Sequence, residues 1–215
     1  FTTEIVCIID RSGSMNSIRS DAVGGFNRFL EDQKAIPDPA SLTLIQFDDF
    51  SEIIHERTPL HLVPPLHPRM YRPRGRTALL DAVGQTVSKV GNRIVKTPKE
   101  LRPAHVIVAI LTDGMENASR SYTRAQIFKM ITRQQTRYDW NFIFLAANQD
   151  AICEGNRIGI QRRERYNWRA DSRGTREAFA SMSARVRQSR VREGERFFRN
   201  PLTERNVDKG IGYDS

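Results

Sequence analysis

The chain has 215 residues, which is enough for one large domain with a full hydrophobic core or for a domain with an appendage. Its formal net charge of +9 is unevenly distributed: residues 157–199 contain 13 Arg and 5 acidic residues, whereas the remainder contains 21 basic and 20 acidic residues. No run of about 18 apolar residues occurs, so we expect no membrane span, and two cysteines are too few for a disulfide framework.

The two cysteines favour a reducing compartment. Cys7 falls in an apolar run and Cys153 follows a later one, which is typical of unpaired thiols. No secretory signal is visible, so we expect a cytoplasmic protein. Because the chain begins with Phe1 instead of Met, a leader removed upstream stays an open alternative.

The first half of the chain alternates between strand and helix patterns. The β-branched run at 5–9 predicts a strand buried on both faces, and apolar residues at helical spacing predict a helix over 18–34. A strand follows at 42–47, and after a two-aspartate turn the chain returns at 53–55 as an antiparallel edge strand. Residues 58–75 contain five prolines and therefore predict a loop.

The second half continues the alternation. Helices are predicted at about 77–94, 123–136 and 175–191, and strands at 106–111, 140–147 and 166–168. Strands alternating with helices indicate βαβ crossovers, so we predict an α/β fold with a doubly wound, mostly parallel sheet, one antiparallel edge strand and helices on both faces. We assign residues 1–192 to this domain and residues 193–215, which show no periodicity, to a C-terminal tail or docking arm.

Oxygen-bearing side chains follow the first predicted strand at alternate positions. Asp10, Ser12 and Ser14 lie in the turn that leaves this strand, and residues two apart in an extended turn share a side, so their oxygens can point at one spot. Gly13 relieves the backbone crowding of such a loop. All three ligands are hard oxygens and two are neutral, which suits Mg²⁺ better than zinc. The alternative is that Asp10 or Ser14 caps the following helix.

Two further predicted loops should meet this one. Asp113 ends a later central strand, and Thr77 opens the intervening helix. Open parallel sheets bind ligands outside the carboxyl ends of their strands, where the strand order reverses. The three loops together would offer two carboxylates and three hydroxyls, about the set that an octahedral Mg²⁺ needs while it keeps some waters. Because only Asp10 and Asp113 are charged, the ion would still attract an anionic oxygen from outside.

The five oxygen donors, in this order and spacing, resemble the metal-ion-dependent adhesion site (MIDAS) of von Willebrand factor A domains. The resemblance covers roughly residues 3–190. The stretches 74–82 (RGRTALLDA) and 111–117 (LTDGMEN) are similar to those of small intracellular bacterial or phage members, a group that includes proteins associated with tellurite-resistance and stress operons.

This resemblance implies a divalent cation, usually Mg²⁺, with Mn²⁺ or Ca²⁺ as alternatives. Ser12, Ser14 and Thr77 would hold it directly, whereas Asp10 and Asp113 would act largely through water. A vacant coordination position would then accept a Glu or Asp carboxylate from a partner protein. The implied function is a non-enzymatic protein-binding module, such as an intracellular stress-related or assembly adaptor.

Residues beside the predicted metal ligands are candidates for partner contact. Arg11 and Arg76 would steer anionic surfaces toward the site. Met115, Glu116 and Asn117 follow the Asp113 turn and are further candidates, although Glu116 and Asn117 could instead start the next helix.

Two other functions are weighed against this one. The Arg-rich segment 157–199 could bind nucleic acid, with Tyr166 and Trp168 available for stacking, although a solvated helix face or an acidic protein partner is favoured. A metal-assisted hydrolase is less favoured, because nothing in the sequence places a histidine base beside Ser12 or Ser14 and the four histidines lack zinc-ligand spacing.

Overall fold

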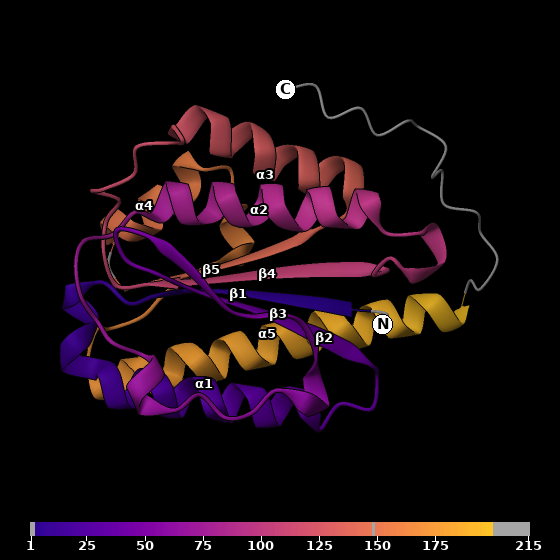
Figure 1. The fold of residues 1–215 in the computed structure, drawn as a ribbon, viewed down its shortest axis with the longest axis horizontal. Coiled ribbons are helices and arrows are strands. Elements are labelled where there is room, and N and C mark those ends of the chain that lie inside the picture. Colours follow the sequence, from indigo (N-terminus) through magenta and orange to yellow (C-terminus); the bar gives the residue numbers. More distant parts are fainter. Residues whose placement is uncertain (1–2, 148, 200–215) are drawn as a thin grey trace.

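The computed structural model describes residues 3–147 and 149–199, in which a six-stranded sheet lies between two layers of helices (Figure 1). The strands are β1 (Thr3–Asp10), β2 (Ala40–Phe47), β3 (Ser51–Pro59), β4 (His105–Thr112), β5 (Asn141–Ala146) and β6 (Arg165–Asn167). The helices are α1 (Arg19–Lys34), α2 (Leu79–Lys96), α3 (Arg124–Tyr138), α4 (Gln149–Arg157) and α5 (Ser172–Arg199).

The order of the strands across the sheet is β3-β2-β1-β4-β5-β6. β1 pairs in parallel with β2 and β4, β5 pairs in parallel with β4 and β6, and β3 pairs antiparallel with β2 at one edge. This confirms the predicted doubly wound, mostly parallel α/β sheet with an antiparallel edge strand. Because the chain passes from β1 to β2 and later returns to the other side of β1 with β4, the strand order reverses between β1 and β4. Their carboxyl ends therefore flank the place where open sheets bind ligands.

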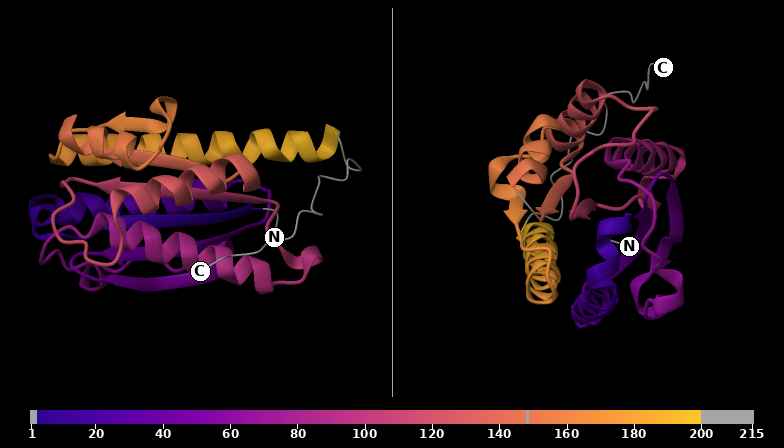
Figure 2. Two further views of the ribbon diagram at one scale, coloured as in Figure 1. Left: turned by 90° about the horizontal axis from the view of Figure 1, so that it is seen from above. Right: turned by 90° about the vertical axis from the view of Figure 1, so that its left-hand side faces the viewer.

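The sheet has a hydrophobic core on each face, because successive side chains of a strand point to opposite sides. Ile5, Cys7 and Ile9 of β1 pack in the core that includes side chains of α1 and α5, whereas Val6 and Ile8 pack in the core that includes side chains of α2 and α3. α1 and α5 lie side by side on one face, and α2, α3 and α4 cover the other (Figures 1 and 2). The apolar central strands are thus covered on both sides, as parallel strands require.

The chain departs from the predicted elements mainly in its last third. The sequence pattern does not predict α4, because nine residues provide too few apolar positions for the helical period to stand out. α5 begins at Ser172 and continues to Arg199, so residues 193–199, which we assigned to the tail, extend this helix. Residues 200–215 lie outside the described residues, and the division into a domain and a tail stays a prediction.

The proline-rich segment contains more regular structure than predicted. β3 continues to Pro59, which an edge strand tolerates because it can leave one side of its backbone without hydrogen bonds. Two short 3₁₀ turns, Leu60–Leu62 and Pro68–Met70, follow within the predicted loop.

Both thiols are unpaired in the structure, as the sequence predicted: Cys7 is buried in β1 and Cys153 is exposed on α4. Burial raises the pKa of the Cys7 thiol well above its ordinary value, because the charged thiolate would lose its hydration. Within residues 3–147 and 149–199, no helix combines the length and the apolar character needed to cross a membrane.

Candidate metal centre

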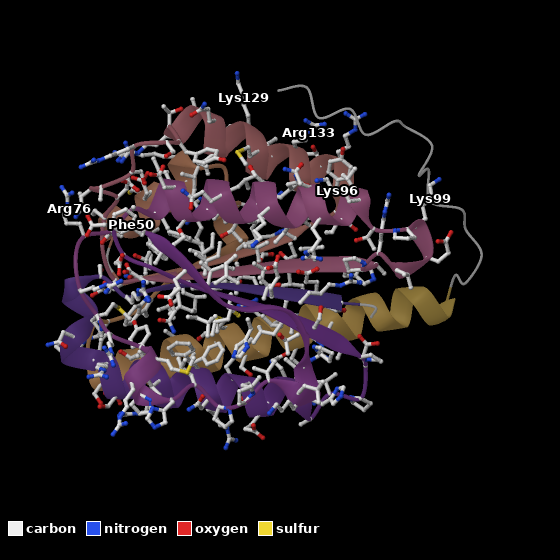
Figure 3. The ribbon with its side chains drawn as sticks, viewed as in Figure 1. Phe50, Arg76, Lys96, Lys99, Lys129 and Arg133 are labelled. Carbon is white, nitrogen blue, oxygen red and sulfur yellow. The ribbon has the colours of Figure 1, made fainter. Side chains whose placement is uncertain are left out.

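The three loops that the sequence singled out meet at one edge of the sheet. Asp10 ends β1, Asp113 directly follows β4, and Thr77 lies just before α2. The carboxyl ends of parallel neighbours β1 and β4 share this edge, which explains the convergence. It is the left end of the molecule in Figure 3, where Arg76 and Phe50 are labelled on the adjoining loops.

Hydrogen bonds join four of the five predicted donors. The hydroxyl oxygens of Ser12 and Ser14 are 3.2 Å apart, and the Ser14 hydroxyl donates to Asp113 Oδ1 at 2.8 Å. The Ser12 backbone N–H donates to Asp10 Oδ1 at 2.6 Å. The turn after β1 therefore aims two hydroxyls and a carboxylate at the loop after β4.

Thr77, the fifth donor, is held against the loop after β4. Its backbone N–H donates to the Asn117 side-chain oxygen at 2.9 Å, and its carbonyl accepts from the Asn117 N–H at 3.1 Å. A methyl group built on Gly114 would come within 2.9 Å of Thr77 Oγ1. The hydroxyl thus lies beside the residue that follows Asp113, and the absence of a side chain at Gly114 leaves room for it.

The two carboxylates are placed where negative charge is costly. Asp10 is fully buried, and burial together with the nearby Asp113 carboxylate raises the pKa of Asp10 to about 7, although hydrogen bonds from Thr112 and Ser12 oppose the shift. The Thr112 hydroxyl donates to Asp10 Oδ2 at 2.6 Å. Burial also raises the pKa of Asp113. Two repelling carboxylates in a buried site are stabilised by a cation between them.

The donor chemistry fits a hard divalent cation. Two carboxylates and three hydroxyls provide oxygen ligands alone, which suit Mg²⁺, Mn²⁺ or Ca²⁺. Within the described part of the chain, no group of three or more His, Cys, Asp or Glu side chains is placed to hold a metal ion. A metal ion at this edge would therefore depend on Ser12, Ser14 and Thr77 as well as on the two acids.

Asp48, at the turn after β2, ties the surrounding loops together. Its buried carboxylate accepts from Arg11 Nε at 3.0 Å and from Arg74 Nε at 2.9 Å, and its carbonyl accepts from the Ala78 N–H at 2.9 Å. One side chain and its backbone thereby connect the β1 turn to the segment that leads into α2. The donors on these two segments are held at a fixed separation.

Backbone contacts add a second connection between the same segments. The Gly13 N–H donates to the Gly75 carbonyl at 3.1 Å, and Gly75 has a φ of +63°, which favours glycine. A Cβ at this position would also lie 2.1 Å from Asp49 Oδ2. The buried Tyr71 hydroxyl donates to the Asp10 carbonyl. These contacts position the turn after β1 without using any of the five donor side chains.

The residues predicted to contact a partner differ in their placement. Arg11 is buried, with its Nε paired to Asp48 and its Nη1 2.5 Å from Glu52, so the prediction that it steers partners at the surface is wrong. Its position next to Asp10 in the sequence does not put it in the site, because its side chain turns toward the end of β2. Arg76 and Met115 are both more than half exposed beside the site, and their role in binding stays a prediction.

Glu116 and Asn117 do not start a helix, and since Glu116 is half-buried and Asn117 is exposed, their role in partner contact stays a prediction. α3 begins later, at Arg124. The Glu116 carboxylate accepts from the backbone N–H groups of Leu80 at 2.9 Å and Ser119 at 2.7 Å, while Asn117 holds Thr77 as described above. Both residues therefore fasten the loop after β4 to the beginning of α2.

Three residues that support the site were missed by sequence reasoning. Thr112 is a polar residue at the end of a mostly apolar strand, and Asp48 directly follows the strand beside the first one, so both positions can be recognised in the sequence. Tyr71 lies among prolines, and no pattern in the sequence links it to Asp10.

Most arginines of the segment 157–191, where side chains are described, have partners within the protein. Arg176 is 2.7 Å from Asp21 on α1, and Arg173 is 2.8 Å from Glu177. The buried Arg190 donates to the carbonyls of Gln33, at 2.7 Å, and Asp38. Arginines that bridge α5 and α1 stabilise the helix pair.

The two aromatic residues considered for stacking on bases are occupied by the protein itself. Trp168 is buried in the core beneath α1 and α5, and the Arg185 guanidinium lies 4.5 Å from the centre of the Tyr166 ring. The prediction that Trp168 is available for stacking is therefore wrong, whereas for the partly exposed Tyr166 it stays a prediction.

Comparison with solved structures identifies the fold. A von Willebrand factor type A protein from Catenulispora acidiphila superposes with a TM-score of 0.57 and 17% identity, over 85% of this chain and 42% of that one. Proximal thread matrix protein 1 from the mussel byssus gives a TM-score of 0.57 with 13% identity, over 84% of this chain and 45% of that one.

The same mussel protein with a zinc-occupied MIDAS motif gives a TM-score of 0.56 with 14% identity, over 84% of this chain and 44% of that one. The chain thus spans less than half the length of these structures. No protein-family model and no curated protein matches the sequence. The six-stranded sheet, the reversal of strand order between β1 and β4, and these structural matches show that the chain has a von Willebrand factor A-like fold.

Proposed function

We propose that the chain is a metal-dependent protein-binding module. Asp10, Ser12, Ser14, Thr77 and Asp113 would hold one divalent cation, with Mg²⁺ preferred, and an acidic side chain of a partner protein would complete its coordination. The observation that carries this proposal is the convergence of these five oxygen donors from three loops where the strand order reverses. When bound, the cation supplies a localised positive charge that a carboxylate recognises.

The choice of cation and of partner chemistry follows from the donor set. Three of the five donors are neutral hydroxyls, and oxygen ligands alone favour Mg²⁺ over softer metals. The zinc-occupied MIDAS motif of the mussel protein supports a divalent cation in this fold. Arg76, whose side chain is 59% exposed and lies 3.0 Å from Asp49, stands at the rim, where its guanidinium would contact an acidic surface.

The scaffold contributes by holding the donors in place before a cation arrives. The Gly13–Gly75 and Thr112–Asp10 hydrogen bonds position the β1 turn, and Asn117 positions Thr77. A site that is already arranged loses little conformational entropy on binding.

A Mn²⁺ titration, followed by the electron paramagnetic resonance of the free ion, tests the metal site. We expect one site in the wild-type chain and a loss of affinity of at least about tenfold in Ser14→Ala. Ser20→Ala is the matched control, because this exposed serine lies on α1 and should leave binding unchanged. Equal affinities for Ser14→Ala and Ser20→Ala would contradict the assignment.

Partner capture tests the binding mode. A partner retained in Mg²⁺ should be released by a chelator and should not be retained by Asp10→Asn. Capture that resists the chelator and survives the substitution would reject metal-dependent binding, even if the Mn²⁺ titration succeeds.

Catalysis is not part of this proposal. In this proposal Ser14 and Asp113, which are joined by a hydrogen bond, serve as metal ligands, and neither is assigned a role as nucleophile or general base. We expect no turnover of generic phosphoesters with Mg²⁺ or Mn²⁺. A nucleic-acid function gains no support from the paired arginines of α5, and a gel shift at two ionic strengths checks this directly.

A further inference from the structure

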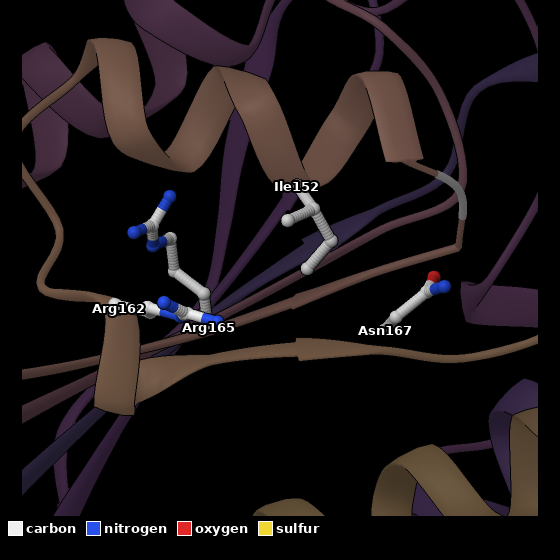
Figure 4. Close-up of a pocket in the computed structure, with 4 residues that line it drawn as sticks. All are labelled: Ile152, Arg162, Arg165 and Asn167. Atoms are coloured by element: carbon white, nitrogen blue, oxygen red, sulfur yellow. The ribbon is translucent and has the colours of Figure 1, made fainter.

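A cavity of about 300 Å³ lies between α4 and β6, away from the strands that carry the metal centre (Figure 4). Its lining residues are Ile152 of α4, Arg162, which precedes β6, and Arg165 and Asn167 of β6. Arg165 and Asn167 are two positions apart on one strand, so both side chains lie on the face toward α4. The volume is at the lower end of the range of small-ligand pockets.

The Arg165 side chain is held in place by packing. A Cβ built on Gly155 of α4 would lie 3.1 Å from Arg165 Cδ and 2.7 Å from the Phe144 ring, so the stem of Arg165 passes against bare helix backbone. Arg165 Nε is buried and has no hydrogen-bond partner among the described residues. A buried N–H without an acceptor is unfavourable, and a bound acceptor would relieve this cost.

The carboxylates near the cavity whose side chains are described are paired with other arginines. Arg157 lies 3.6 Å from Glu154, and Arg163 lies 3.5 Å from Glu164. The acids of these two ion pairs are engaged by arginines that do not line the cavity. Among the side chains that the structure describes, those of residues 3–147 and 152–191, none forms an ion pair with Arg162 or Arg165.

We propose that this cavity binds a phosphate group as a dianion, either free or carried by a small-molecule monoester. Two guanidinium groups match its charge and can each donate two hydrogen bonds to its oxygens, and the Asn167 amide adds a further donor. Ile152 forms an apolar wall beside them. The Arg-rich segment thus contains a defined anion site in addition to the arginines that stabilise α5.

Calorimetric titration with inorganic phosphate tests this site. It is done in EDTA at low ionic strength, because a cation at the metal centre would bind phosphate itself. We expect saturable binding that weakens at least about tenfold in Arg162→Gln and in Arg165→Gln, the size that follows when hydrogen bonds to a charged group are lost. Arg163→Gln is the matched control: it removes the same charge from a neighbouring residue outside the cavity and should leave affinity nearly unchanged.

Gly155→Ala gives a test in which no charge is removed. The added methyl would press on the Phe144 ring, 2.7 Å away, and on Arg165 Cδ, 3.1 Å away, so phosphate affinity should fall although the net charge is unchanged. Circular dichroism confirms that each variant is folded. The proposal is overturned if the folded wild-type chain shows no saturable phosphate binding, or if Arg163→Gln weakens binding as much as Arg162→Gln.

Adenosine monophosphate and inorganic phosphate, compared under the same conditions, distinguish the two sources of the group. Tighter binding of the nucleotide assigns a monoester, because its organic part would contact the cavity wall. Equal affinity assigns free phosphate. Acetate, a monoanion, should bind more weakly than either, and acetate binding as tight as that of phosphate would overturn the assignment of a dianion.

Discussion

Gly114 and Thr77 illustrate how closely single residues are fitted at the metal centre. Because a Cβ at Gly114 would lie 2.9 Å from Thr77 Oγ1, Gly114→Ala should displace this hydroxyl and lower Mn²⁺ affinity about 10- to 100-fold, the range seen when the positioning of a metal ligand is disturbed. The same titration measures it. Gly24→Ala, where a Cβ meets nothing within 4 Å, is the control, and equal affinity of the two variants would contradict the placement of Thr77.

Arg11 shows that a residue beside a ligand can have a structural role. Arg11→Gln would remove a buried ion pair with Asp48, and we expect a loss of about 3 kcal/mol in the free energy of unfolding, the low end for a broken buried pair because Arg74 still contacts Asp48. Urea denaturation measures it. Arg76→Gln removes an exposed pair and should cost less than about 1 kcal/mol. Equal losses for the two variants would show that Arg11 is not a buried anchor.

At the scale of elements, α1 and α5 pack so closely that two adjacent glycines differ in their roles. A Cβ on Gly25 would lie 2.4 Å from the Phe179 ring of α5, whereas Gly24 faces open space. We expect Gly25→Ala to destabilise the fold by about 1–3 kcal/mol through overpacking. Gly24→Ala should stabilise it by about 0.5–1 kcal/mol, because alanine favours a helix. Thermal and urea denaturation of the two variants measure these changes in stability. If both variants were destabilised or both stabilised, the close contact between Gly25 and Phe179 would be contradicted.

The start of α3 is defined by a capping box between Thr123 and Gln126. Thr123→Ala should reduce the free energy of unfolding by about 1 kcal/mol, because the backbone N–H of Gln126 loses its acceptor. Thr136→Ala, near the other end of the same helix, should have little effect. Urea denaturation that gives equal changes for both variants would show that the cap does not contribute.

At the scale of the whole molecule, a cation at the metal centre would link three loops and stabilise the folded chain. At a free Mg²⁺ concentration 100 times the dissociation constant, binding should add about 2.7 kcal/mol. For a chain of this size that corresponds to a rise in Tm of about 5–10 °C relative to EDTA. Calorimetry of the wild-type chain and of Ser14→Ala measures it. A rise of the same size in Ser14→Ala would place the stabilising ion elsewhere.

The amino-acid sequence by itself determined the α/β architecture and the five candidate ligands. Buried parallel strands are continuous apolar runs, and amphipathic helices keep a regular period, so both are visible locally. Asp10, Ser12 and Ser14 are close in sequence. Thr77 and Asp113 lie in loops that are predicted at the same edge of the sheet, because the carboxyl ends of parallel strands share one edge. The sequence pattern is weaker for the short helix α4 and for the part of α5 beyond its predicted end, so neither was predicted.

The tertiary structure alone decided which way side chains turn once the loops meet. In the folded chain Arg11 is buried against Asp48, and Trp168 lies in the core. Glu116 and Asn117 hold the loop after β4 against the beginning of α2. The folded structure also packs the Arg165 side chain against the backbone of α4 at Gly155. These placements depend on contacts between residues far apart in the chain. Such contacts do not produce a periodic pattern of residues in the local sequence.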